Sequence, residues 1–67
     1  MDMQPVNSSN LAEAGWEDGT LVVTFRSGAT YTYRGVSEQD YQDLLSSPSP
    51  GGFFKRSIAA RYKGVKT

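Results

Sequence analysis

Two turn signals, Asp18-Gly19 and Ser27-Gly28, lie close together and separate three segments with the composition of β-strands. Asp-Gly is a preferred pair for a two-residue hairpin turn, because both positions need positive φ angles that these residues tolerate. The segments from Leu11 onward are rich in β-branched and aromatic residues, which favour strands. The pattern therefore predicts three consecutive antiparallel strands joined by two tight turns.

The first turn fixes the register of the first two strands, because a two-residue loop at Asp18-Gly19 pairs Glu17 with Thr20. Residues that pair directly point to the same face of a sheet. The pairs expected on one apolar face are Trp16 with Leu21, Ala14 with Val23, and Ala12 with Phe25.

The second turn allows two registers, and the apolar pattern chooses between them. A two-residue loop at Ser27-Gly28 would pair Tyr31 with Thr24 and place the tyrosines on the polar face. A three-residue loop, Arg26-Ser27-Gly28, with glycine in the left-handed conformation, keeps the large apolar residues together. The pairs are then Phe25 with Ala29, Val23 with Tyr31, and Leu21 with Tyr33, and we prefer this register.

A helix is expected after Gly35, with Ser37 as its N-cap and Asp40 three residues later in a weak capping box. Its apolar stripe consists of Tyr41, Leu44 and Leu45. The Ser46 to Pro50 segment, which carries two prolines, should end it.

A second helix is predicted from the Ser-Pro-Gly-Gly run at Ser49 to about Lys63. Ser49 is the expected N-cap, and Pro50 takes the first helical position, where its missing N–H is harmless. Gly64 is expected to close the helix in the left-handed conformation. The buried stripe consists of Phe54, Ile58 and Tyr62, which are spaced by four.

The predicted fold is α+β, with the order β-β-β-α-α and two helices packed on one face of a three-stranded antiparallel sheet. We expect a partly ordered N-terminal arm over residues 1–10, one domain over 11–64 and a short tail over 65–67. With 67 residues and no cysteine, the chain must stabilise itself with an aromatic core rather than with disulfides. It has no apolar run long enough to span a membrane and no signal-peptide pattern, so a cytoplasmic protein without membrane partners is expected.

The net charge of zero conceals a strong asymmetry along the chain. All seven acids precede Ser49, together with only Arg26 and Arg34, so this part carries a net charge of −5. The last nineteen residues hold five cations and no acid. This separation points to an anionic partner at the C-terminal end.

Five segments stand out together, in a fixed order along the chain. They are Val6-Asn7-Ser8-Ser9-Asn10-Leu11, Ala14-Gly15-Trp16, Leu21, Val23 and Phe25 with Gly28, Tyr31-Thr32-Tyr33, and Ser49-Pro50-Gly51-Gly52-Phe53-Phe54 followed by Ile58 and Tyr62. With these segments the chain resembles the KTSC domain, a module of roughly sixty residues found at the C-terminus of some lysyl-tRNA synthetases and alone in bacterial and phage proteins. The resemblance covers about residues 3 to 64.

The resemblance implies RNA binding and no catalytic site. Three positions depart from the family pattern: Trp16 stands where tyrosine is usual, Lys55 replaces an asparagine, and Ala59 replaces an arginine. If the usual asparagine and arginine contact a ligand in relatives, this chain must use Lys55, Arg56 or Arg61 instead.

The composition argues against an enzyme. Histidine and cysteine are absent, which excludes most acid–base relays, nucleophilic dyads and transition-metal sites. The acids cluster on the first turn and the first predicted helix, where solvated surface is the ordinary explanation. No metal or cofactor is expected.

The Ser-Pro-Gly-Gly run is the principal candidate for a binding site. A helix start presents free backbone N–H groups, and Gly51 and Gly52 would let a phosphate approach closely. Lys55 and Arg56 follow within about one turn. The alternative is that Ser49 only caps the helix and Gly51 only permits tight packing against the sheet.

The remaining candidates divide by their expected positions. Arg56 and Lys63 should point away from the buried stripe, whereas Arg61 should be half-buried and need either a carboxylate such as Asp40 or a phosphate. Tyr31 and Tyr33 either stack on bases or belong to the core, and the preferred register favours the core. Arg26 and Arg34 are possible additional phosphate contacts.

Three functions follow from these residues. The first is a non-catalytic RNA-binding module that contacts phosphates through the basic helix. The second is a bacterial or phage protein that binds or sequesters a small nucleotide. The third is an assembly module that pairs with a second copy or a host protein through the open sheet edges or the opposite charges of its two ends.

Overall fold

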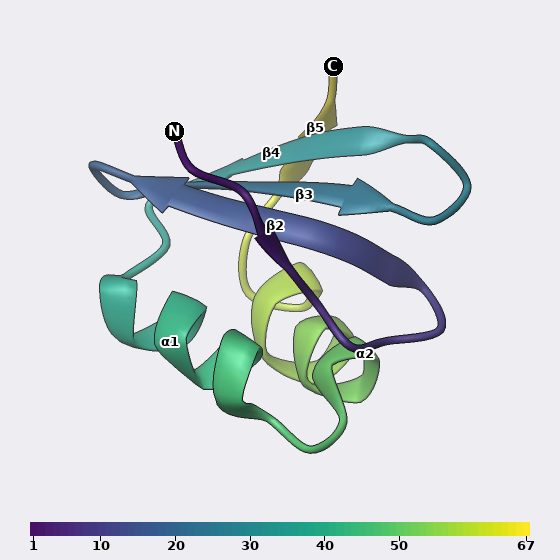
Figure 1. Ribbon diagram of the computed structural model, residues 1–67. Coiled ribbons are helices and arrows are strands. Elements are labelled where there is room, and N and C mark those ends of the chain that lie inside the picture. Colours follow the sequence, from purple (N-terminus) through teal and green to yellow (C-terminus); the bar gives the residue numbers. More distant parts are fainter.

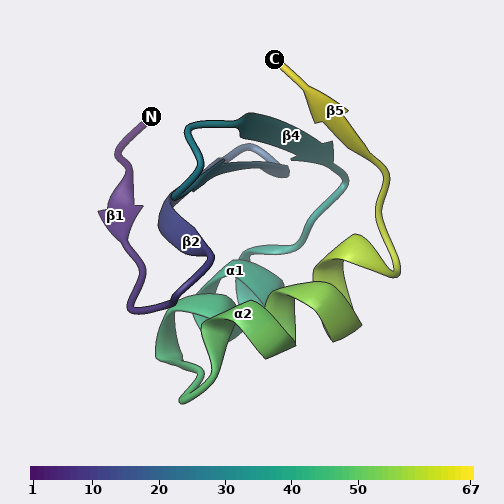
Figure 2. The ribbon, with the colours of Figure 1, turned by 90° about the vertical axis from the view of Figure 1, so that its right-hand side faces the viewer.

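The computed structural model describes all 67 residues as one antiparallel sheet with helices on one face. The five strands are hydrogen-bonded in the order β1-β2-β3-β4-β5, the same as their order in the sequence. The sheet is strongly curved, and the helices lie against its concave side (Figures 1 and 2). The elements are β1 (Gln4–Pro5), β2 (Leu11–Glu17), β3 (Thr20–Phe25), β4 (Thr30–Arg34), α1 (Glu38–Ser46), α2 (Pro50–Phe53), η1 (Phe54–Ala59) and β5 (Gly64–Lys66).

Both predicted hairpin turns are confirmed. Asp18 and Gly19 have φ angles of 50° and 81°, as a two-residue turn with two left-handed positions requires. Gly28 has a φ of 100°, and the amide of Phe25 donates to the carbonyl of Ala29 across the three-residue loop. The pairs Val23–Tyr31 and Leu21–Tyr33 follow, so the preferred register is correct.

The far end of the first hairpin differs from the prediction. Leu11, rather than Ala12, lies opposite Phe25, because a bulge between Leu11 and Glu13 adds one residue to β2. Strict alternation would have turned the small Ala12 toward the core. The bulge brings in the larger Leu11, which is only 1% exposed, and therefore buries more apolar surface.

The predicted sheet of three strands was wrong, since two short edge strands extend it to five. β1 pairs with β2 through Gln4 and Pro5, inside the expected N-terminal arm. β5 pairs with β4 at the other edge and takes in residues expected to form a tail. Figure 2 shows β1 and β5 at opposite ends of the curved sheet. Neither segment has the alternating apolar pattern that identifies a strand, so only pairing with its neighbour makes it one.

The first helix begins as predicted, because the Ser37 side chain accepts a hydrogen bond from the Asp40 amide at 3.1 Å. The second begins at Pro50, but Ser49 makes no capping hydrogen bond through its side chain. From Phe54 the helix widens into the π-helical segment η1 and ends at Ala59, short of the predicted Lys63.

Gly64 was predicted to close this helix with a left-handed conformation, and instead it starts β5. Its φ angle is not positive, unlike that of Gly35 at the end of β4. A Cβ atom on Gly64 would lie 2.5 Å from Cζ of Tyr33. Glycine is therefore needed because the Tyr33 ring lies directly over the backbone of its strand partner.

The core lies between the concave side of the sheet and the helices. Its members are Val6, Leu11, Ala14, Leu21, Val23, Tyr33, Val36, Tyr41, Leu44, Phe54 and Ile58. Trp16 is partly buried beside it and donates its indole N–H to the carbonyl of Val36 at 2.8 Å. This bond ties the first hairpin to the start of α1. None of the helices has the length and apolarity needed to cross a membrane.

Candidate functional site

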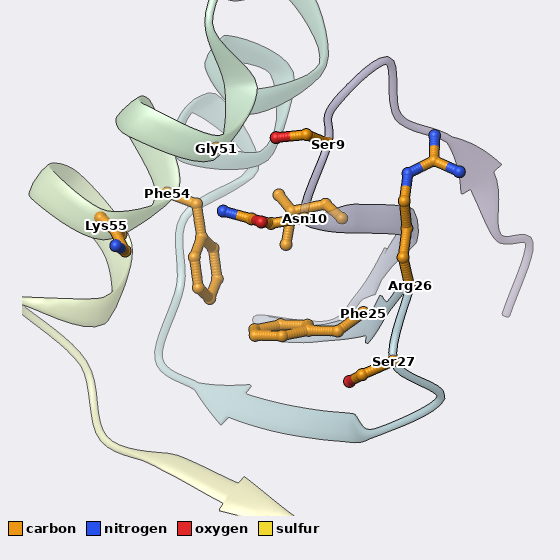
Figure 3. Close-up of a pocket in the computed structure, with 9 residues that line it drawn as sticks. Ser9, Asn10, Phe25, Arg26, Ser27, Gly51, Phe54 and Lys55 are labelled. Atoms are coloured by element: carbon orange, nitrogen blue, oxygen red, sulfur yellow. The ribbon is translucent and has the colours of Figure 1, made fainter.

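A cavity of about 230 Å³ opens where three distant parts of the chain meet. The loop before β2 supplies one wall, the end of β3 another, and the start of the second helix the third. Figure 3 shows Phe25 and Phe54 beside this space, with Lys55 on one side and Arg26 and Ser27 on the other. The lining residues are Ser9, Asn10, Leu11, Phe25, Arg26, Ser27, Gly51, Phe54 and Lys55.

Two phenylalanine rings, together with Leu11, form the apolar part of the cavity. The centroids of Phe25 and Phe54 lie 5.7 Å apart and the rings are nearly perpendicular, at 87°. Tyr31 packs against Phe25 at 5.6 Å, and Tyr33 packs edge-on against Phe54 at 5.4 Å. Edge-to-face contacts of this kind are favourable, so the two rings are held in place by the core beneath them.

A polar groove of about 400 Å³ adjoins the cavity along the helix start. Its only apolar side chains are those of Pro48 and Pro50, and it is otherwise formed by the loop of residues 7–10, Ser49, Gly51, Gly52 and Lys55. The groove and the cavity share Ser9, Asn10, Gly51 and Lys55. The two hollows therefore form one composite site, aromatic at one end and polar at the other.

Gly51 allows the loop and the helix start to approach each other closely. A Cβ atom at this position would lie 3.0 Å from the Ser8 hydroxyl oxygen and 3.9 Å from Nδ2 of Asn10. A larger residue would push the loop away from the helix and widen the seam between the cavity and the groove. Gly51 therefore has the packing role that the sequence suggested, and it also lines the candidate site.

The loop beside the helix start is held by hydrogen bonds from its backbone to the Ser8 hydroxyl and to Arg26. The Ser8 hydroxyl accepts from the amides of Asn10 at 3.1 Å and Leu11 at 3.3 Å. Arg26 donates its Nε to the Ser8 carbonyl at 2.6 Å, and its own amide donates to the Asn10 carbonyl at 2.8 Å. The backbone of Asn10 is fixed by these contacts, while its side chain points to the cavity (Figure 3).

Lys55 lines both the cavity and the polar groove, while Arg56 lies beside the groove at Gly52 without lining either hollow; both cations are exposed. Neither has a carboxylate within 4.0 Å, and the same holds for Arg26. A Cβ atom on Gly52 would stand 2.9 Å from Nη1 of Arg56, so the guanidinium folds back over the first helical turn. The Ser49 hydroxyl oxygen lies beside this guanidinium, 3.1 Å from the position that a Cβ atom on Gly52 would take.

Arg61 is not part of this group. It is exposed rather than half-buried, and its Nη1 lies 3.5 Å from Oδ1 of Asp40 on α1. Tyr62 donates its hydroxyl to Oδ2 of the same carboxylate at 2.8 Å and accepts from Nη2 of Arg61 at 3.1 Å. The hydrogen bond to Asp40 raises the pKa of Tyr62. The carboxylate partner foreseen for Arg61 is therefore the correct alternative, and the phosphate partner is not needed.

Lys63 and Arg34 lie on a different surface. They line a hollow of about 400 Å³ with Thr32, Val65 and Thr67, at the strands β4 and β5. Both are exposed and without a carboxylate partner, but neither lines the cavity or the polar groove. The basic residues of the C-terminal segment are consequently divided between two surfaces instead of forming one stripe.

The two tyrosines proposed as a stacking platform belong to the core side of the sheet. Tyr33 is only 6% exposed, and its burial raises the pKa of its hydroxyl, with the neighbouring Tyr31 adding a smaller effect. Tyr31 is partly buried and packs against the same cluster. Their place behind Phe25 and Phe54 supports the rings that do face the cavity.

Sequence reasoning missed Ser9, Asn10, Phe25 and Phe54 as site residues. Ser9 and Asn10 were assigned to a weakly patterned arm, although they stand in the first segment of the family resemblance. The two phenylalanines fitted the apolar face of the sheet and the helix stripe, so nothing in the pattern separated them from ordinary core residues. The cavity at the edge of the core is what distinguishes these two phenylalanines from the other core residues.

Comparisons with known proteins agree over nearly the whole chain. A model of the KTSC domain matches residues 7–62. A protein of Tsukamurella paurometabola is 37% identical over 65 residues, which cover 94% of this chain and 97% of that protein. The crystal structure of a KTSC domain protein from Yersinia pestis superposes with a TM-score of 0.91 at 35% identity, covering 98% of this chain and 96% of the other.

Proposed function

The chain belongs to the KTSC domain family, and we propose that it is a non-catalytic module that binds single-stranded RNA at the composite site. Arg26, Lys55 and Arg56 would contact phosphates around its rim. The polar groove would hold the backbone of the strand, and the cavity would face its bases.

The observation that supports this proposal is the grouping of unpaired cations around an aromatic cavity. Of the seven lysines and arginines, Arg61 alone has a carboxylate within 4.0 Å. The charges of Lys55 and Arg56 are thus free for an external anion. Proteins that bind single strands combine such a cationic groove with rings on which bases stack.

A single strand suits this site better than a duplex. The site is a narrow hollow between a loop and a helix, not an extended basic surface, and double-stranded RNA is recognised across its wide minor groove. The sequence-specific recognition of RNA usually involves unstacked bases that reach into such hollows. With three cations the expected affinity is modest and strongly dependent on salt.

The test is the salt dependence of binding to a fluorescently labelled single-stranded RNA, measured by anisotropy. Each phosphate neutralised on a single strand contributes about −0.7 to the slope of log K against log salt, so three contacts predict a slope of about −2. The double variant Lys55→Ala/Arg56→Ala should reduce the slope to about −0.7. The variant Arg34→Ala/Lys63→Ala changes the net charge equally on the other surface and should leave the slope near −2.

Two results would contradict the proposal. One is the absence of salt-dependent binding to any single-stranded RNA. The other is equal weakening by the two double variants, which would mean that RNA responds to net charge rather than to this site. Circular dichroism of both variants verifies that the comparison is made between folded proteins.

A further inference from the structure

We infer that the cavity receives one unpaired nucleobase, stacked on the ring of Phe25 with its polar edge toward the Asn10 amide. This inference rests on the proposed function and specifies what the cavity adds to it. Phosphate contacts alone would bind any strand equally, whereas a base cavity requires an unpaired base at one position.

The size of the cavity fits one planar ring system. Its volume of about 230 Å³ lies below the range of roughly 300–1,000 Å³ that is typical of sites for drug-sized molecules. The cavity therefore suits a single base inserted from an open strand, with the sugar and the phosphate remaining outside.

Phe25 is prepared to act as the stacking surface. Its ring is held between Tyr31, tilted by 33°, and Phe54, which is nearly perpendicular to it. Phe25 is nevertheless only partly buried, unlike Phe54, which is 5% exposed. A ring that is fixed by its neighbours and still accessible loses little entropy when a base stacks on it.

Asn10 lies where the edge of such a base would be. Its side-chain amide offers both a donor and an acceptor, the combination that pairs with the polar edges of nucleobases. The hydrogen bonds of its backbone to Arg26 and Ser8 hold the residue in place. Ser9 and Ser27 add two hydroxyl groups to the same lining.

The charges of the lining favour a nucleotide over an aromatic side chain of a protein. Lys55 stands at one side of the cavity and the stem of Arg26 at the other, with the Arg26 guanidinium turned toward the Ser8 carbonyl, and no carboxylate lines the cavity (Figure 3). A nucleotide carries an aromatic base and a phosphate at adjacent positions. The polar groove, which meets the cavity at Gly51 and Lys55, lies where that phosphate would be.

The experiment uses a short single-stranded RNA in which one base is 2-aminopurine, whose fluorescence changes when the base leaves the stack of its neighbours in the strand. The fluorescence change expected on binding should be lost in Phe25→Leu, together with at least about fivefold of the affinity. Phe53→Leu is the matched control, because Phe53 is partly buried on the same helix as Gly51 but does not line the cavity. A strand of equal length with an abasic site at the probe position, and the free nucleotide AMP, complete the set.

If Phe25→Leu proves unstable, Asn10→Ala provides the same comparison on an exposed loop residue. Weaker binding of the abasic strand and of the cavity variants supports the inference. Equal binding of the abasic and intact strands, with no effect of either variant, overturns it and leaves phosphate binding intact. Binding of AMP that depends on Phe25, without RNA binding, supports the base cavity and refutes the RNA function. Binding of neither ligand refutes both.

Discussion

Gly64 stands opposite Tyr33 in the pairing of β4 and β5, and we predict that Gly64→Ala destabilises the protein severely. The added Cβ atom would lie 2.5 Å from Cζ, 2.6 Å from Cε2 and 2.7 Å from the hydroxyl oxygen of Tyr33. These distances are all shorter than van der Waals contact, so the ring or the strand must move.

The ring has little freedom to move. Tyr33 is 6% exposed and its ring contacts Phe54 edge-on at 5.4 Å, so a shift would disturb the centre of the core. Overpacking of this kind costs about 1–3 kcal/mol. A domain of 67 residues has a total stability of only about 3–10 kcal/mol. A loss of about 2 kcal/mol corresponds to a decrease in Tm of about 8–16 °C.

The assay is a double-mutant cycle with Tyr33→Leu, followed by thermal and urea unfolding. In the Tyr33→Leu background the ring is absent, so Gly64→Ala should cost less than about 0.5 kcal/mol or be slightly stabilising, because alanine is preferred over glycine within a strand. The coupling free energy between the two positions is then about 0.5–3 kcal/mol. An equal cost of Gly64→Ala in both backgrounds would refute the reasoning, since the ring would then not be the cause.

Three further predictions concern the helices and their ends. Ser37→Ala should lower the free energy of unfolding, measured by urea denaturation, by about 1 kcal/mol, because it removes the hydroxyl that caps the Asp40 amide. An unchanged free energy of unfolding would mean that this cap is unimportant. Gly52→Ala should leave the stability unchanged or raise it by up to about 1 kcal/mol in thermal unfolding, because alanine favours the helix. The new methyl group would displace only the flexible end of the Arg56 side chain. A marked decrease in Tm would contradict this prediction. The pKa of Tyr62 is raised in the folded state by its hydrogen bond to Asp40, so this contribution to stability is complete below about pH 10 and is lost as the pH rises through the folded-state pKa. Tyr62→Phe should weaken this alkaline dependence of stability, and tyrosinate absorbance should show one late-titrating group fewer; an unaltered titration would refute the assignment.

Local turn chemistry explains why the central sheet could be predicted. The two hairpins depend on Asp18, Gly19 and Gly28, whose φ preferences act within a few residues of the chain. The same is true of Ser37, which caps a helix three residues away. Features of this range are encoded by neighbouring residues and need no knowledge of the rest of the fold.

The edge strands and the end of the second helix could not be predicted in this way. β1 and β5 contain two and three residues and are strands only because β2 and β4 present free backbone groups to them. The second helix was predicted to reach Lys63 because Tyr62 continues the spacing of four between Phe54 and Ile58. In the structure Tyr62 turns to Asp40 on α1, a contact across 22 residues that outweighs the local periodicity.

The candidate site also has features that the sequence predicts and features that depend on the tertiary structure. The sequence alone determined that the chain forms a hairpin meander followed by two helices, and that its cations are concentrated in the last nineteen residues, because composition and turn preferences are properties of short segments. Tertiary structure decided which of those cations share a surface. It paired Arg61 with Asp40, placed Lys63 beside Arg34, and left Lys55 beside Asn10 and Phe25. Asn10 and Lys55, the most distant of these neighbours, lie 45 residues apart in the chain, and only the packing of the helices against the curved sheet brings them together.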